Sequence, residues 1–87
     1  MWIFLFWNTD VNENRAHVHV GKKGSQILCK IWLEPIIEVA DKGEFSDAQI
    51  KEILLVTEQY YQQLMAQWKA FKQGKPIRII KVTKEND

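Results

Sequence analysis

The sequence predicts an α+β fold, in which an antiparallel sheet of three or four strands is packed by one long C-terminal helix. Short apolar or alternating segments, separated by turn-forming residues, fill the first part of the chain and are typical of strands. A stripe of apolar residues at helical spacing then runs without interruption over residues 47–73. The 87 residues are enough for a single domain, residues 1–87, and too few for two.

Three segments are predicted as strands. Residues 2–7, Trp-Ile-Phe-Leu-Phe-Trp, are apolar throughout, which predicts a strand covered on both faces. Residues 16–20 alternate, and the glycine-bounded residues 21–24 predict a hairpin turn. Residues 25–33 form the third strand, which Pro35 should end because proline cannot donate to a ladder. The core face of this strand is Ile27, Cys29, Ile31 and Leu33.

A long helix is predicted over residues 47–73. Ser46 and Gln49 form a capping box at its start, and Gly74 is the stop signal at its end. Its apolar stripe is Ile50, Ile53, Leu54, Thr57, Tyr61, Leu64, Trp68 and Phe71. The connector from 36 to 45 either adds a short strand or packs under the helix. Residues 77–82 are a possible last strand.

The predicted helix is longer than the predicted sheet. A helix over residues 47–73 is roughly 40 Å long, whereas three or four short strands make a sheet roughly 20 Å across. The overhanging helix and the uncovered sheet face would leave a large apolar surface, and such surfaces mark interfaces. The sequence therefore predicts a homodimer.

Charge is unevenly distributed, although the formal net charge is only +1. Residues 69–84 contain no acid and six basic residues: Lys69, Lys72, Lys75, Arg78, Lys81 and Lys84. Such a segment can favour a nucleic acid or an acidic partner, but lysines also collect at helix C-termini because they suit the dipole there. Both interpretations stay open.

Cys29 is the single cysteine, which excludes an intramolecular disulfide and a cysteine-based zinc cluster and favours a reducing cytoplasm. The apolar residues 2–7 are far short of the ~20 residues of a membrane helix. They also lack the basic start and the small-residue cleavage site of a signal peptide. We therefore expect a cytoplasmic protein with no membrane partner.

His17 and His19 form the candidate chemical site. Strand alternation places Val18 and Val20 toward the helix and both imidazoles on the opposite face. Two such histidines can bind zinc or a similar divalent metal. Zinc needs three or four ligands, so Glu34, Asp10 or Glu13, or the histidines of a second subunit, would have to complete the shell.

Two other interpretations of the histidine pair remain. The rings can be structural, hydrogen-bonded locally and packed against Trp32 or the aromatic residues of the first strand. Alternatively, they can act as general acid and base beside Arg15 or Lys30 in a small ribonuclease. The candidate binding residues are Arg15, His17, His19, Trp32 and Glu34, and the candidate catalytic and metal-binding residues are His17 and His19.

The motifs His-Val-His-Val at 17–20 and Trp-Leu-Glu-Pro at 32–35 resemble those of a family of small bacterial proteins, domain-of-unknown-function family 4160. Its members resemble this chain also in a Phe-rich first strand (residues 3–7), a Phe-Ser helix start (45–46) and a late tryptophan, Trp68. The chain departs from the family pattern where Arg15 and Ala16 replace two prolines and Glu44 replaces a glycine.

The leading hypothesis is a non-catalytic interaction module, a homodimer that binds a protein partner in a two-gene bacterial system. Members of the family are often encoded beside another small protein, in the style of toxin–antitoxin modules, so the resemblance implies a bacterial protein with a partner encoded nearby. It assigns no catalytic residue. A small ribonuclease or metal-binding nucleic-acid-acting protein that uses His17 and His19 is the alternative.

Overall fold

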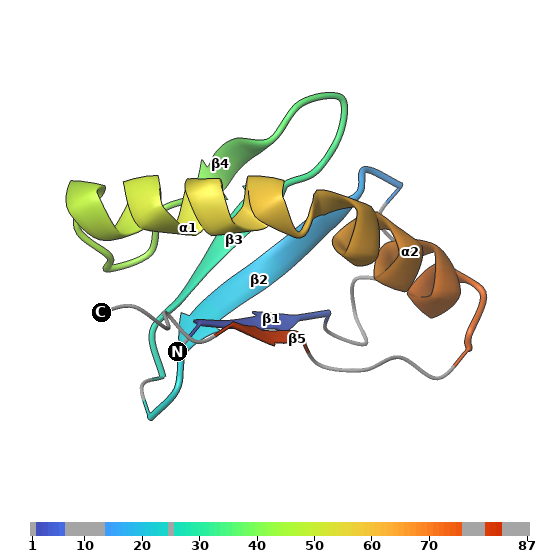
Figure 1. The fold of residues 1–87 in the computed structure, drawn as a ribbon, viewed down its shortest axis with the longest axis horizontal. Coiled ribbons are helices and arrows are strands. Elements are labelled where there is room, and N and C mark those ends of the chain that lie inside the picture. Colours follow the sequence, from blue (N-terminus) through green and yellow to red (C-terminus); the bar gives the residue numbers. More distant parts are fainter. Residues whose placement is uncertain (1, 7–13, 25, 76–79, 83–87) are drawn as a thin grey trace.

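The structure is a computed structural model, and it describes residues 2–6, 14–24, 26–75 and 80–82. Two helices lie over one antiparallel sheet (Figure 1), and the molecule measures 36 × 23 × 23 Å. The strands run in the spatial order β4-β3-β2-β1-β5, and every neighbouring pair is antiparallel. The elements in chain order are β1 (Trp2–Leu5), β2 (His17–Lys22), β3 (Leu28–Trp32), β4 (Glu38–Asp41), α1 (Asp47–Gln59), α2 (Tyr61–Lys72) and β5 (Ile80–Val82).

The α+β class and the antiparallel sheet are confirmed, but the described part of the chain has five strands where three or four were predicted. The extra strand is β4, which forms in the connector whose structure the sequence left open. β5 lies within the predicted last strand at 77–82. Residue 7 of the predicted first strand and residue 25 of the predicted third strand lie outside the described residues.

The prediction of one long helix is wrong, because the helix breaks at Tyr60 into α1 and α2. Tyr60 has φ −104° and ψ 17°, away from helical values. One turn earlier, the buried Thr57 hydroxyl donates to the carbonyl of Ile53 at 2.7 Å, a back-bond that often bends helices. Because of the bend, α2 turns toward the end of the sheet where β1 stops and β2 begins (Figure 1). The helical segment therefore does not run straight past the sheet, as the prediction of one long helix required.

The core lies between the helices and one face of the sheet. On the sheet side it includes Phe4, Val18, Val20 and Ile31 of the strands and Leu33 directly after β3, each at most 1% exposed. Across from them the predicted apolar stripe is buried in both helices, at Ile50, Ile53, Thr57, Leu64 and Trp68. The predicted orientation of the two valines and the predicted helical stripe are therefore both confirmed.

The capping box at the start of α1 is also confirmed. The Ser46 hydroxyl accepts from the Gln49 backbone N–H at 3.2 Å, and the Gln49 side-chain oxygen accepts from the Ser46 N–H at 2.9 Å. β1 lies between β2 and β5, with Trp2 and Phe4 buried on the helix side. Ile3 and Leu5 on its other face are only half-buried. The sequence predicted that both faces of this strand are covered, but only the helix side is covered fully.

Candidate functional site

The two histidines of β2 lie together, as strand alternation predicts. Their ring centroids are 5.5 Å apart and the rings meet edge to face at 88°. Pairing with β3 sets His17 opposite Trp32 and His19 opposite Lys30, so these four side chains share one sheet face. This face is opposite the one on which Val18 and Val20 are buried.

His17 is completely buried, at 0% exposure. Its ring centroid lies 5.6 Å from that of Trp32 and 5.0 Å from that of Trp68, which α2 carries to the end of the sheet. The Nδ1 atom lies 3.0 Å from the carbonyl oxygen of Arg15. Since a carbonyl only accepts, Nδ1 carries the proton and donates it. The ring of His17 is thus a packed and hydrogen-bonded part of the interior.

Trp32 lies between two cations. The Arg15 guanidinium carbon is 4.2 Å from the centroid of the Trp32 ring, and Lys30 Nζ is 4.6 Å from it. Arg15 is held there because its Nε donates to the Glu34 carbonyl oxygen at 2.7 Å and its guanidinium pairs with the Glu38 carboxylate. The structure therefore brings the five predicted binding residues together, with Glu34 contributing its backbone carbonyl. We call Arg15, His17, His19, Trp32 and Trp68 the histidine cluster.

A complete metal site is not found among the described residues. No group of three or more histidine, cysteine, aspartate or glutamate side chains that could hold a metal ion occurs in that part of the chain. Asp10 and Glu13, two of the proposed extra ligands, lie outside it. Zinc requires three or four ligands, and the histidine cluster as described supplies two.

The basic residues at the end of α2 are placed as the helix dipole favours. Lys69 and Lys72 lie in the last turn of the helix, and Lys72 Nζ is 5.6 Å from the ring of Trp68. Lys75 is exposed just beyond it. The side chains of Arg78 and Lys81 lie outside the described residues, so a nucleic-acid contact through this segment remains a prediction.

Cys29 lies in the core at 2% exposure. Burial raises the pKa of its thiol to about 11, so the sulfur is protonated and unreactive near neutral pH. This agrees with the prediction that Cys29 lies on the core face of its strand.

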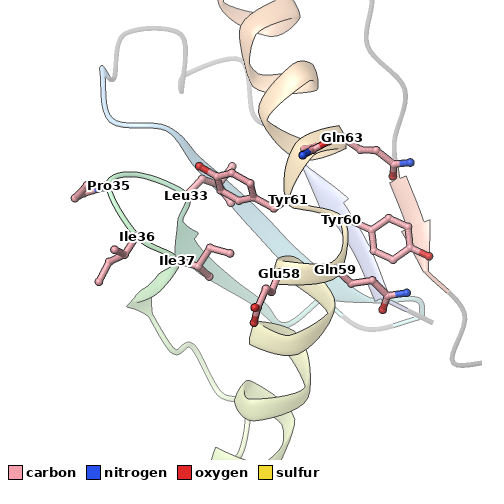
Figure 2. Close-up of a pocket in the computed structure, with 10 residues that line it drawn as sticks. Leu33, Pro35, Ile36, Ile37, Glu58, Gln59, Tyr60, Tyr61 and Gln63 are labelled. Carbon is pink, nitrogen blue, oxygen red and sulfur yellow. The ribbon is translucent and has the colours of Figure 1, made fainter.

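A groove at the helix break was not predicted from the sequence. It has a volume of about 730 Å³ and lies between the loop from β3 to β4 and the junction of α1 with α2 (Figure 2). We call it the helix-break groove. Its lining residues are Leu33, Pro35, Ile36, Ile37, Glu58, Gln59, Tyr60, Tyr61, Gln62 and Gln63.

The helix-break groove is apolar on its loop side and polar on its helix side. Leu33 is fully buried beneath it, whereas the side chain of Ile36 on the rim is 63% exposed. Figure 2 shows the Tyr61 ring extending toward Leu33, with Glu58 on the helix side of the groove. Among the described residues of the lining, Glu58 is the only one with a formal charge. Two sequence features could have indicated the groove: the apolar pair Ile36-Ile37 directly after a strand-ending proline, and Thr57 within the helical stripe.

Fold and site together define a small domain in which a twisted antiparallel sheet is covered by a broken helix, with an open groove at the break. The chain belongs to the family described as Domain of unknown function (DUF4160), whose model matches residues 1–69. That span contains the whole helix-break groove and the whole histidine cluster. Comparison with curated proteins gave no match, and neither did comparison with solved structures. Within the described residues, neither helix is long and apolar enough to cross a membrane.

Proposed function

We propose that this domain is a non-catalytic interaction module that binds a protein partner through the helix-break groove. The observation that carries the proposal is the groove itself, in which the apolar side chains of Ile36 and Ile37 face the Tyr61 ring across the depression. Tyrosines beside aliphatic residues are typical of the energetic centre of protein interfaces. Ile36, exposed at 63% on the rim, offers apolar area that a bound partner would remove from water.

The chemistry of the groove suits binding better than catalysis. Among its described residues the lining contains one carboxylate and no histidine, cysteine, serine or lysine, the side chains used most often as nucleophile or base. In the histidine cluster, His17 is inaccessible and cannot reach a substrate as general acid or base. These facts favour an interaction module over a two-histidine ribonuclease.

The first partner to test is the small protein encoded beside this gene, the arrangement that the family resemblance implies. In a toxin–antitoxin-like pair, one protein covers a surface of the other, and an open apolar groove is suited to such a contact. Self-association is the second possibility, since a homodimer would also cover exposed apolar residues such as Ile36 and Leu55.

Co-expression of the chain with the neighbouring gene product, followed by affinity purification, tests the proposal. Ile36→Glu places a charge on the groove rim and should abolish co-purification. Leu55→Glu is the matched control, because Leu55 is 64% exposed, close to the 63% of Ile36, but lies outside the groove lining. Retention of the partner by Ile36→Glu at the wild-type level would refute the proposal, and sedimentation of the chain alone would distinguish a homodimer from a heterologous complex.

A further inference from the structure

We infer that the helix-break groove binds a peptide segment of a partner protein in which a large apolar side chain stands beside a lysine or arginine. This inference rests on the proposed interaction function and specifies the chemistry of the partner. It follows from three properties of the described residues: the shape of the groove, the placement of its charge, and the consequence of pairing the groove with a second copy of itself.

The shape of the groove requires an apolar anchor on the partner. The groove is open, and its volume of about 730 Å³ lies within the range of about 300–1,000 Å³ that is usual for ligand sites. The side chains of Leu33, Ile37 and Tyr61 converge on its floor (Figure 2). A small ligand seated on that floor would leave Ile36 exposed on the rim, whereas a protein segment crossing the rim covers it.

The charge of the groove requires a cation on the partner. Glu58 stands at the end of α1 in the lining, and the described residues form no ion pair with it. Glu34, next to the lining residue Pro35, is also exposed, and Arg15 binds its backbone carbonyl and not its carboxylate. Among the described residues that line the groove there is no lysine or arginine. A partner cation adjacent to the apolar anchor would therefore meet acid on the helix side and on the loop side.

The same charge disfavours a second copy of the chain as the occupant. A two-fold dimer brings the same patch of both subunits together. Two grooves facing each other would set Glu58 of one copy near Glu58 of the other, and such like-charge contact is unfavourable at an interface. The observations thus favour a heterologous, basic and apolar segment.

Selection from a random peptide display library on the full-length protein tests the inference. The enriched peptides are expected to combine a Leu, Phe or Trp with a neighbouring Lys or Arg. Their synthetic forms, measured by fluorescence anisotropy, should lose all binding to Ile36→Glu. They should bind Glu58→Lys about three- to tenfold more weakly than wild type. Glu44→Lys makes the same charge change at an exposed residue outside the lining, and it should leave binding unchanged.

The outcomes separate this inference from the proposed function. If the neighbouring gene product depends on Ile36 but selection enriches uncharged or acidic peptides, or binding ignores Glu58→Lys, the inference is overturned while the interaction module stands. If neither the gene product nor any selected peptide is sensitive to Ile36→Glu, both are overturned. A concentration-dependent dimer that Ile36→Glu dissociates would also overturn the inference, because the second copy would then be the occupant.

Discussion

Replacement of His17 by alanine should destabilise the protein strongly, because the ring is a buried packing element. Its centroid lies 5.0 to 5.6 Å from the ring centroids of His19, Trp32 and Trp68, and Nδ1–H donates to the Arg15 carbonyl. Each ring pair is worth about 0.5–1.5 kcal/mol and the hydrogen bond about 1 kcal/mol. Allowing for partial collapse around the site, we expect His17→Ala to lower the free energy of unfolding by about 3 kcal/mol.

Urea denaturation followed by tryptophan fluorescence and far-UV circular dichroism measures this loss. In a domain of this size about 3 kcal/mol lowers the midpoint of thermal unfolding by at least about 12 °C. His17→Phe keeps a ring of similar size and loses only the hydrogen bond, so it should cost about 1 kcal/mol. His19→Ala, at a half-buried position, should cost less than His17→Ala. A His17→Ala protein within about 0.5 kcal/mol of wild type would refute the structural role and return the pair to the list of candidate catalytic groups.

Three further predictions follow from the described residues. Gly43→Ala should lower the free energy of unfolding by at least about 3 kcal/mol, because φ is +62° and the new Cβ would lie 2.2 Å from a backbone carbonyl oxygen of β3. Gly24→Ala is the control: φ is +85° but the space around it is open, so the loss in the same urea titration should be about 1 kcal/mol. Cys29 should resist alkylation until urea unfolds the chain. Stability should fall as pH rises from 9.0 toward 11, since the thiol ionises first in the unfolded state. The hydrogen bond from Lys42 lowers the pKa of Asp47, so Lys42→Ala should raise that pKa in an NMR titration. The stabilisation that the Lys42–Asp47 pair gives is present above pH 3.8 and is lost as pH falls through the lowered pKa.

Most of the fold could be predicted from local pattern. Alternation in β2 and β3 fixes which side chains meet the helices, and the capping box at Ser46 and the glycine at 74 set the outer helix limits. β4 could not be predicted, because Glu38–Asp41 is a short segment with exposed side chains at Glu38, Ala40 and Asp41. Pairing with β3 stabilises it, and such pairing leaves no periodic signal in so short a segment.

The histidine cluster could be predicted only in part. Alternation and hairpin pairing place His17, His19 and Trp32 on one face, which the sequence indicates directly. The burial of His17 depends on Trp68, which reaches the ring because α2 turns at the helix break. A straight helix would have left that ring open, so the sequence could not decide between a chemical and a structural role for His17.

The break at Tyr60 also links the fold to the proposed function. At the break, Tyr60 and Tyr61 point to different sides of the helix (Figure 2). Tyr61 then faces Leu33 and the loop before β4, which creates the groove, while α2 carries Trp68 onto His17. The groove and the buried histidine thus have one structural origin. A variant that straightens the helix should remove the groove and expose the His17 ring, so partner binding and the burial of His17 should be lost together.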